Sequence, residues 1–544
     1  MSGQIASSDE TTRLLGDRTT EDYSSGTEDP PRDYVAATDE PEDATFGESF
    51  DNVPRSKRQL GLTSAVFLVF NRVIGTGIYA TPSVILRTSG SVGVALLMWL
   101  LGALIAAAGT AVYVELGTGL PRNGGEKNYL EFIYRRPRFL VSCSFVAYTL
   151  IIGSAAANSI VFGEYVLHAL AIPPTRFAAR IVAVLVLTFC LVVHGTLLTF
   201  GLRLQNALGA SKLAILAAIA LLGILSLLGF PGLAVRAPYE VPHNFRWANL
   251  WEGSGTGVNG FVTALYSVIW SFIGYANANY ALSEVRDPVR TIKRAAPLAM
   301  TAVTLVYMSV NVAYFAVVSK NDILGSRRIV AALFFRNLFG PATERALSAF
   351  IALSTLGNLL AGQFTQGRVI QELGREGILP YSAFFASNKP FGAPLAGLLT
   401  QYLVSVLFVL GPPPGDAYLF MISTSSYSLA LINTLVSLGL LLLHTPAYHA
   451  FGWAPPFRAP RAVTGLFFLS NVFLVAVPLV PPSPGHRVYD ALPYWLHAAV
   501  ALSVSLVGGA YWYVWSVWLP RRRGYTLTRE WVRQEDGVPR GFQY

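Results

Sequence analysis

From residue 60 onward the chain consists largely of apolar segments long enough to cross a lipid bilayer. The hydrophobic fraction is 53%, and only 13% of the residues are charged, about half the share in soluble domains. In hydrocarbon every backbone N–H and C=O group needs an internal partner, so each segment is expected to be a helix. These features predict an all-α polytopic membrane protein with twelve transmembrane helices, at about 61–86, 92–117, 139–168, 177–199, 207–230, 261–284, 296–318, 345–370, 393–410, 417–443, 463–480 and 494–518.

The positive residues predict how these helices are oriented. Lysine and arginine concentrate in the loops on one side, for example at 122–138, 286–294 and 521–523, and the other side holds fewer. Because cytoplasmic loops are enriched in these residues, both termini are expected in the cytoplasm. The loop between the seventh and eighth helices is discordant. It also contains an apolar run, 329–338, which is predicted to form a short external amphipathic helix.

The tail before the first apolar segment is polar and strongly acidic. It has too few apolar residues to bury a core, so it is predicted to be disordered. Residues 10–15 fit an acidic-dileucine trafficking pattern, which leaves the vacuolar membrane as an alternative to the plasma membrane. The acidic stretch 39–51 lies close to Lys57, and we expect a docking site for ubiquitin-ligase adaptors there, with Lys57 as the acceptor.

Two of the apolar segments are interrupted near mid-span. The first places Thr76 between Gly75 and Gly77, and glycine in a helix interior costs about 1 kcal/mol relative to alanine. The sixth carries Gly274 and Asn277, and an asparagine at this depth is expected to face the bundle or a wet cavity. Unwound backbone is tolerated at membrane depth only where it is buried in protein or lines a cavity. For the first segment, a seam of small residues between packed helices is the alternative.

Corresponding interruptions in two halves of a chain are typical of the ligand site of a secondary transporter. The first and sixth segments correspond if the first ten helices form two halves of five. The N-terminus of a half-helix offers free N–H groups to a carboxylate, and unwound carbonyls accept hydrogen bonds from an ammonium group. A zwitterionic amino acid carries both groups, so an amino acid in transit is the expected ligand.

Several longer motifs carry a family resemblance. They read NRVIGTGIYATP, GSVG, YVELG, PRNGGEKNYLE, ANANYALSEVRDPVRT and QELGREGILP, at 71–82, 90–93, 113–117, 121–131, 276–291 and 371–380. Through them the chain resembles the amino acid–polyamine–organocation (APC) superfamily and its L-type amino acid transporter (LAT)-like permeases. Among these it is most similar to the fungal high-affinity methionine permeases. The resemblance extends from about residue 60 to 520.

The resemblance implies a LeuT-like fold, in which two inverted repeats of five helices are followed by two further helices. The chain would then divide into a disordered acidic cytoplasmic tail (1–58), a first five-helix repeat (59–230), an extracellular loop (231–260), a second five-helix repeat (261–443), helices 11 and 12 (444–518) and a cytoplasmic C-terminal tail (519–544).

The resemblance also implies the ligand contacts. The backbone at 76–78 would hold the substrate carboxylate, and the carbonyls of Val73, Trp270 and Ile273 would hold the ammonium group. Trp270 falls where related transporters have a phenylalanine gate, and Phe272 is the alternative gate. The predicted substrate site consists of Val73, Ile74, Gly75, Thr76, Gly77, Ile78, Trp270, Phe272, Ile273, Gly274 and Asn277.

Lys212 lies inside the fifth apolar segment, where an ionisable residue is by default a functional candidate. It matches a lysine that, in the superfamily, bridges the fifth helix to the unwound part of the first and replaces a sodium ion. It is the predicted coupling residue, and two roles are open. It could be a fixed cation that tethers backbone carbonyls, which we favour slightly, or a group that titrates during transport. A lysine that snorkels to the membrane surface is the structural alternative.

Other polar residues are further pocket candidates. They are Asn158 in the third segment and Ser354, Thr355 and Asn358 in the eighth. The alternative for each is an ordinary hydrogen bond between helices. Glu115, near the cytoplasmic end of the second segment, is expected to pair with an arginine at the gate.

These observations predict a secondary active permease that imports neutral L-amino acids, with methionine as preferred substrate and proton symport as preferred coupling. The alternatives are an exchanger of broader large-neutral specificity and a non-transporting nutrient sensor with the same fold. An intramembrane enzyme would need a catalytic constellation, and the seven histidines are scattered. No enzyme activity, cofactor or metal is therefore expected.

The expected partners are the amino acid, the coupling proton and the lipid bilayer. The basic residues lie in loops between helices, which gives no footprint for nucleic acid. Related exchangers carry a cysteine between the third and fourth helices that links them to a heavy chain. Residues 168–176 contain none, so no disulfide-linked heavy chain is expected.

Overall fold

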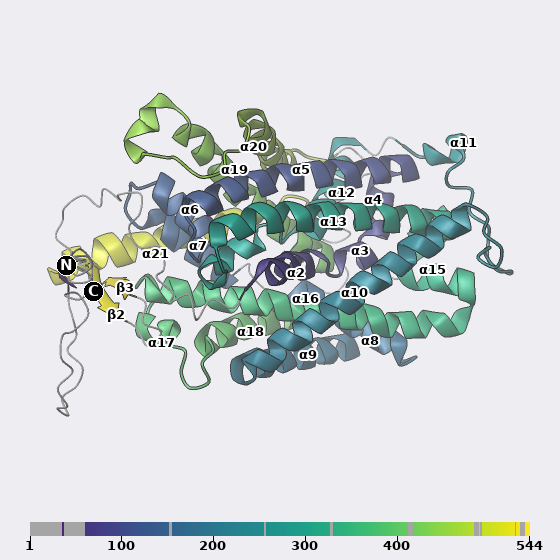
Figure 1. Cartoon of the computed structure of the whole chain (residues 1–544), viewed down its shortest axis with the longest axis horizontal. Coiled ribbons are helices and arrows are strands. Elements are labelled where there is room, and N and C mark those ends of the chain that lie inside the picture. Colours follow the sequence, from purple (N-terminus) through teal and green to yellow (C-terminus); the bar gives the residue numbers. More distant parts are fainter. Residues whose placement is uncertain are drawn as a thin grey trace, which may run out of the picture.

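The computed structural model describes residues 35–36, 60–151, 155–254, 257–326, 330–411, 417–482, 489, 492–527, 529–533 and 539–543. Most of the long helices run along one axis and form a bundle (Figure 1). In chain order the elements are β1 (Val35–Ala36), α2 (Leu62–Val73), α3 (Gly77–Ala80), α4 (Pro82–Ser89), α5 (Val92–Gly119), α6 (Glu126–Ile133), α7 (Leu140–Ile151), α8 (Ala156–Ala169), α9 (Arg176–Thr196), α10 (Leu198–Leu227), α11 (Trp247–Leu250), α12 (Gly257–Phe272), η2 (Asn277–Glu284), α13 (Pro288–Val317), α14 (Lys320–Gly325), α15 (Val330–Phe339), α16 (Pro341–Arg375), α17 (Ser382–Ala386), α18 (Leu395–Leu410), α19 (Ala417–Leu443), η3 (Pro446–Phe451), α20 (Arg461–Ala476), η4 (Val477–Leu479), α21 (Leu496–Trp512), η5 (Tyr513–Trp518), α22 (Leu519–Arg523), β2 (Arg529–Arg533) and β3 (Pro539–Gln543).

Ten helical segments of the described chain are long and apolar enough to cross a bilayer. They are Leu62–Ala80, Val92–Gly119, Arg176–Thr196, Leu198–Leu227, Gly257–Leu282, Pro288–Val317, Pro341–Arg375, Leu419–Leu443, Arg461–Leu479 and Leu496–Arg523. The two other expected spans correspond to α18 and to the pair α7 and α8, which are shorter helices. The predicted all-α polytopic membrane fold is confirmed, while the number twelve and the proposed division of the chain stay predictions.

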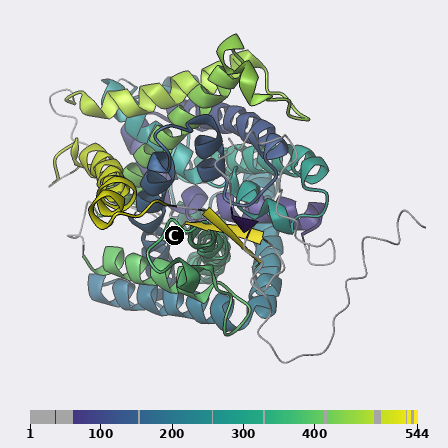
Figure 2. The same cartoon turned by 90° about the vertical axis from the view of Figure 1, so that its left-hand side faces the viewer.

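Three short strands add to the helical fold. β1 pairs antiparallel with β2, and β2 pairs antiparallel with β3. Their sheet lies at the end of the bundle that also carries α17, as the end-on view shows (Figure 2). The sheet joins the tail before residue 60 to the C-terminal segment. The rest of the tail predicted as disordered, with the dileucine pattern and Lys57, lies outside the described residues.

The first transmembrane segment is interrupted at the two glycines. α2 ends at Val73, Ile74 takes an extended backbone with ψ of 96°, and α3 begins at Gly77. α4 follows almost directly, with Pro82 as its first residue. Proline is well suited to that position because the first N–H group of a helix has no intrahelical partner in any case.

The sixth segment is interrupted at a matching place. α12 ends at Phe272, and the short 3₁₀ helix η2 begins at Asn277. Between them Gly274 has φ of +125°, a conformation that other residues rarely adopt. A Cβ atom at Gly274 would also lie 2.6 Å from Cγ of Arg72, so this glycine lets the two interruptions approach closely.

The two interrupted segments lie antiparallel to each other. α2 packs against η2, whereas α3 and α4 pack against α12. In Figure 1 α2 lies between α13 and α16, and both of these helices contact α2 and η2. The two interruptions therefore meet inside the bundle, enclosed by neighbouring helices.

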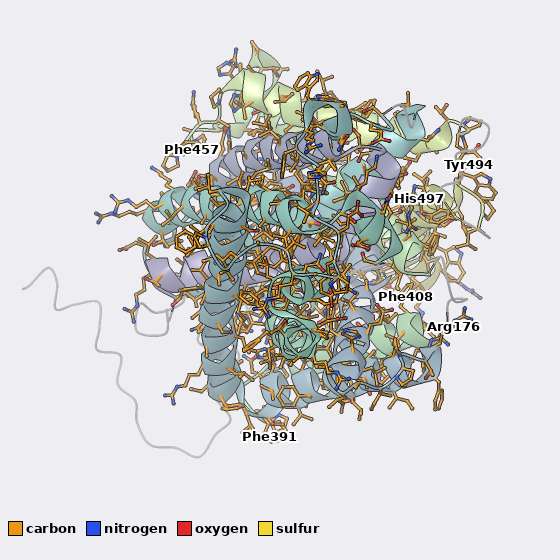
Figure 3. The ribbon with its side chains drawn as sticks, turned by 90° about the vertical axis from the view of Figure 1, so that its right-hand side faces the viewer. Arg176, Phe391, Phe408, Phe457, Tyr494 and His497 are labelled. Atoms are coloured by element: carbon orange, nitrogen blue, oxygen red, sulfur yellow. The ribbon has the colours of Figure 1, made fainter. Side chains whose placement is uncertain are left out.

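Apolar side chains point outward as well as inward. Side chains fill the spaces between helices, and others, such as Phe391, project from the periphery (Figure 3). Leu104, Leu185, Leu305 and Leu506 are each more than half exposed. In a polytopic membrane protein such residues face lipid, which is as apolar as leucine itself.

The helix predicted at 329–338 is observed as α15. It packs against α13 and α16, and most of its apolar residues are buried. The predicted short helix is therefore present, and its position outside the membrane stays a prediction.

Gly223 provides a test of the packing between α10 and α13. A Cβ atom there would lie 2.1 Å from Cβ of Ala313 and 2.5 Å from its Cα atom. We expect Gly223→Ala to force the helices apart and to lower the free energy of unfolding by about 1–3 kcal/mol. The measurement is the thermal unfolding midpoint of the detergent-solubilised protein.

Gly465→Ala in α20 is the matched control, because nothing lies within 4 Å of a Cβ atom at that position. Alanine is the better helix former, so this variant should be as stable as the parent or more stable by up to about 1 kcal/mol. An unchanged midpoint for Gly223→Ala would contradict the close packing.

Candidate functional site

The C-terminal end of α2 leaves main-chain carbonyls that need partners. The last carbonyls of a helix have no intrahelical partner, and no water is present in a bilayer core to replace it. The N–H group of Ile74 lies 2.9 Å from the carbonyl of Phe70. The carbonyls that follow, of Asn71, Arg72, Val73 and Ile74, each receive a hydrogen bond from a side chain on another helix.

Lys212 of α10 supplies two of these bonds. Its side chain is fully buried, its Nζ atom donates to the carbonyl of Ile74, and it lies 3.4 Å from the carbonyl of Asn71. Hydrogen bonds from a charged donor are the stronger ones. Lys212 therefore ties α10 to the first interruption and does not snorkel to the membrane surface.

Tyr307 of α13 joins the two interruptions. Its hydroxyl lies 2.9 Å from the carbonyl oxygen of Val73 and 2.9 Å from that of Ser271 in α12. The rings of Trp99 and Phe272 lie edge-on to it, with centroids 5.3 and 5.1 Å away. This aromatic packing fixes the hydroxyl between the two main chains.

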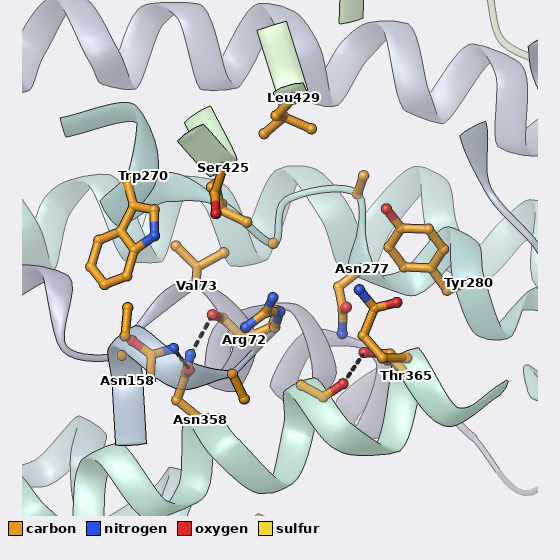
Figure 4. Close-up of a pocket in the computed structure, with 18 of the residues that line it drawn as sticks. Arg72, Val73, Asn158, Trp270, Asn277, Tyr280, Asn358, Thr365, Ser425 and Leu429 are labelled. Atoms are coloured by element: carbon orange, nitrogen blue, oxygen red, sulfur yellow. Dashed lines mark hydrogen bonds between the residues drawn. The ribbon is translucent and has the colours of Figure 1, made fainter. Parts of the chain in front are cut away.

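A chain of side-chain hydrogen bonds surrounds the first interruption. Asn358 of α16 donates through Nδ2 to the carbonyl of Arg72 at 2.6 Å, and its Oδ1 accepts from Nδ2 of Asn158 at 2.7 Å (Figure 4). Oδ1 of Asn158 in turn accepts from the hydroxyl of Thr76, also at 2.7 Å. These hydrogen bonds thus run from α2 through α16 and α8 to Thr76, inside the interruption.

A cavity of about 220 Å³ lies beside both interruptions. Its wall is formed by the two broken segments together with α6, α7, α8, α16, α18 and α19. Figure 4 shows Trp270, Ser425 and Leu429 around it, with Asn277, Tyr280 and Thr365 toward one end.

Many of the residues predicted from the sequence meet at this cavity. The predicted residues that line it are Val73, Gly75, Thr76, Gly77, Asn158, Trp270, Ile273, Gly274, Asn277 and Asn358. The side chains of six others do not line it: Ile74, Ile78, Lys212, Phe272, Ser354 and Thr355. Of the two candidate gates, Trp270 therefore faces the cavity and Phe272 is buried in the packing around Tyr307.

Two of the polar candidates on α16 serve packing. The hydroxyl of Thr355 donates to the carbonyl of Ile351 one turn earlier, at 2.9 Å. Ser354 is buried on the same helix, 2% exposed, and does not line the cavity. Neither side chain lines the cavity, and a role for them at the ligand stays a prediction.

Each interruption leaves main-chain groups without a backbone hydrogen bond. Among the described residues, the N–H groups of 75–78 make none, and they lie just before and at the start of α3. Amides at the start of a helix favour an anion. The carbonyl of Ile273, in the second interruption, accepts no backbone hydrogen bond within the described chain.

Gly75 and Gly77 are needed for this close arrangement. A Cβ atom at Gly75 would lie 2.7 Å from Nδ2 of Asn358, and one at Gly77 would lie 2.9 Å from the Cα atom of Ser271. The glycines therefore allow the side chain of Asn358 and the backbone of α12 to touch the unwound main chain.

Many residues on the cavity wall were not singled out from the sequence, and three of these carry ionisable groups and lie in motifs of the family resemblance. They are Arg72 at the end of α2, Tyr280 in η2 and Glu126 at the start of α6. The hydroxyl of Tyr280 donates to Oε1 of Glu126 at 2.8 Å. Each residue lies in a motif of the family resemblance, which was the one available signal, but no spacing in the sequence shows that the three positions meet.

Glu126 lies outside the membrane-spanning segments, in the short helix α6. Burial raises the pKa of its carboxyl group, and the hydrogen bond from Tyr280 opposes that shift. A buried carboxylate is costly to keep ionised, so its charge state is sensitive to its surroundings.

The expectation for Glu115 was wrong. Instead of an arginine, its carboxylate contacts Nε2 of His444 at 2.7 Å and Nε1 of Trp453 at 3.0 Å, and it accepts from the N–H group of Ala459 at 2.8 Å. All three partners lie in the connection between α19 and α20, so Glu115 anchors that connection to α5.

The structure offers little for metal binding. Among the described residues no group of three or more His, Cys, Asp or Glu side chains is placed to hold an ion. Cys143 and Cys190 are both buried and free.

Comparison with known proteins gives several matches that cover most of the chain. A family model described as amino acid permease matches residues 60–504. The chain is 45% identical over 498 residues to the high-affinity methionine permease of Saccharomyces cerevisiae, covering 91% of this chain and 86% of that protein. It is 31% identical to the low-affinity methionine permease of the same yeast, covering 90% and 88%. It is 27% identical to the b(0,+)-type amino acid transporter 1 of Mus musculus, covering 80% and 85%.

Asn358→Ala tests the hydrogen-bond chain around the first interruption. The substitution leaves the carbonyl of Arg72 and Nδ2 of Asn158 without their partner. Each orphaned buried group costs about 1–3 kcal/mol, so the thermal unfolding midpoint should fall clearly. Asn321→Ala, at an exposed position, is the control and should leave the midpoint within error. Equal midpoints for both variants would contradict the structural role of Asn358.

Proposed function

Since the chain belongs to the amino acid permease family, we propose that it is a secondary active transporter that imports neutral L-amino acids, with methionine as its preferred substrate, by proton symport. The proposal rests first on the two sets of free main-chain groups beside the cavity. It rests also on the resemblance to two permeases named for methionine.

In this proposal the substrate's charged ends bind the main chain. The carboxylate binds the free N–H groups of 75–78, where the positive end of a helix dipole adds to the attraction. The ammonium group binds the free carbonyl of Ile273 and the remaining acceptor capacity of Val73 and Trp270. Because these contacts use backbone groups, they recognise any α-amino acid and leave selectivity to the side-chain pocket.

The side-chain pocket is suited to a neutral, largely apolar group. Its wall includes Phe145, Val369, Met421, Leu429 and Ile432. A charged substrate side chain would lose its hydration against these residues without gaining a partner there, which costs several kcal/mol. A thioether is apolar and polarizable, and it makes favourable contacts with aromatic rings such as that of Phe145.

Trp270 is proposed as the gate over the substrate. It is the last aromatic residue of α12 to face the cavity, four residues before the strained glycine Gly274. Its indole can move when η2 and α12 change their angle, because the backbone between them is not helical.

Lys212 is proposed to act as a fixed cation that holds the first interruption in shape. Its Nζ atom bonds two carbonyls at the break, and it does not line the cavity. This supports the tether over the titrating role. It takes the place that a bound sodium ion would otherwise have.

The transporter is proposed to lie in the plasma membrane with both termini in the cytoplasm. The distribution of lysine and arginine over the loops supports that orientation. The acidic tail near Lys57 is proposed to receive ubiquitin-ligase adaptors, and the dileucine pattern leaves the vacuolar membrane as the alternative location.

Reconstitution into proteoliposomes tests the proposed transport. An inward proton gradient should drive accumulation of labelled methionine, and a protonophore should abolish it. Other neutral amino acids in excess should compete, whereas lysine and glutamate should not. Uptake that requires an internal amino acid would instead identify an exchanger, and binding without flux would identify a sensor.

Lys212→Met tests the tether. The substitution removes the donor to the carbonyl of Ile74, which costs about 1–3 kcal/mol, so the affinity for methionine should fall about ten- to a hundred-fold. The measurement is the Kd for labelled methionine. Lys389→Met, at an exposed position, should bind like the parent. An unchanged Kd for Lys212→Met would argue against the tether.

A further inference from the structure

A single carboxylate faces the cavity. Of the described residues that line it, Glu126 is the only acidic one. It begins α6, which lies at one end of the bundle, and it is 2% exposed. A buried carboxylate at the wall of a ligand cavity is costly, and such groups usually have a function.

The two carboxylate oxygens of Glu126 are in different surroundings. Oε1 accepts the hydrogen bond from Tyr280 at 2.8 Å. Oε2 is buried and has no hydrogen-bond partner among the described residues. Buried polar atoms are nearly always paired in proteins, so an unpaired oxygen at a cavity indicates that it takes a partner in another state.

The groups around Glu126 leave its charge only partly balanced. The tyrosines around it are Tyr280 from η2, Tyr275 from the turn before η2, Tyr113 from α5 and Tyr129 from α6 itself. Two cations lie farther off. Arg122 precedes α6 near Tyr129, and Arg72 of α2 lies beyond Tyr280.

The neighbouring lysine does not neutralise Glu126. Nζ of Lys127 contacts the carboxylates of Glu131 and Glu376 instead. The hydroxyl of Tyr113 donates to Oδ1 of Asn433 in α19 at 2.8 Å, and its proximity to Glu126 favours the ionised carboxylate. Oε2 itself has no hydrogen-bond partner among the described residues, so it has the capacity to take a proton.

We propose that Glu126 carries the coupling proton of the transport cycle, an inference that rests on the proposed import of amino acids by proton symport. A hydronium ion that enters the cavity gives its proton to Oε2, which turns the carboxylate into a carboxylic acid and leaves a water molecule. In the inward-facing state the acid returns the proton to water on the cytoplasmic side. No other reactant takes part.

Electrostatics explain how this proton and the substrate are coupled. The substrate's carboxylate and an ionised Glu126 border the same cavity, and like charges in a medium of low dielectric repel each other strongly. Protonation of Glu126 removes that repulsion and leaves the positive field of Arg72 to the substrate. Proton and amino acid therefore favour each other's binding, and the effect is reciprocal by thermodynamic necessity.

The protonation state of Glu126 also affects η2, the second half of the sixth segment. Tyr280 belongs to η2, which is joined to α2 through the hydrogen bond from Asn277 to the carbonyl of Leu68 at 3.3 Å. A hydrogen bond to an ionised acceptor is roughly twice as strong as one between neutral groups. Protonation of Glu126 loosens the bond to Tyr280 and so frees the second half of the sixth segment.

Glu126→Gln in proteoliposomes tests this inference, because glutamine has the shape of the protonated acid. The variant should keep methionine counterflow, in which internal unlabelled methionine drives uptake, and should lose accumulation driven by a proton gradient. Its Kd for methionine should not depend on pH, whereas that of the parent should rise by up to about tenfold per pH unit above the pKa. Glu131→Gln in the same helix, which does not face the cavity, should behave like the parent.

Tyr280→Phe is a second variant, and it tests the proposal even if Glu126→Gln does not fold. The hydrogen bond from Tyr280 stabilises the ionised form of Glu126, so its loss raises the pKa. The midpoint of the pH dependence of methionine binding should then move to higher pH. A midpoint that stays in place or moves lower would overturn the proposal.

The remaining outcomes separate this inference from the proposed function. Accumulation by Glu126→Gln that still follows the proton gradient overturns the inference and leaves proton symport intact. A parent protein with counterflow but no response to the gradient overturns both proton symport and the role of Glu126. Absence of methionine counterflow in the parent would overturn the proposed substrate itself.

Discussion

The structure depends on one requirement, that main-chain carbonyls at the end of α2 must find partners where no water is available. The chain meets this requirement with side chains from three other helices. Lys212 comes from α10, Tyr307 from α13 and Asn358 from α16. A helix that stops inside a membrane is thereby fixed at a defined place, and the amides that follow the stop stay unused by the fold.

The same requirement explains why the two interruptions face each other. One tyrosine hydroxyl lies within 2.9 Å of a carbonyl from each broken segment, so neither break can shift without disturbing the other. Gly274 permits contact with Arg72 because it has no Cβ atom. The cavity beside them is therefore lined by main chain as well as by side chains, and it presents donors at one interruption and an acceptor at the other.

Few charged residues lie at or near this cavity. Lys212 is occupied with carbonyls behind the wall, whereas Arg72 and Glu126 belong to the wall itself. The amine of Lys212 is used up by the carbonyls at the break, whereas one oxygen of Glu126 has no hydrogen-bond partner among the described residues. The charge of a buried carboxylate of this kind is sensitive to its surroundings.

The sequence by itself determined the elements that depend on local chemistry. Long apolar runs predicted the membrane helices, because a segment in hydrocarbon must satisfy its own backbone hydrogen bonds. The glycines at 75 and 77 predicted the place where the first helix stops, because the conformational freedom of glycine is a property of the residue itself. Only the tertiary structure decided which distant side chains donate hydrogen bonds to the carbonyls at the end of α2. No local sequence pattern shows that Glu126 and Tyr280, separated by 154 positions, form a hydrogen bond. Nor does one show that Glu115 pairs with a histidine and not with an arginine. The strands joining both ends of the chain likewise depend on pairing across its whole length. Local rules fix where a helix begins and ends, whereas contacts between helices are fixed by the packing of the entire bundle.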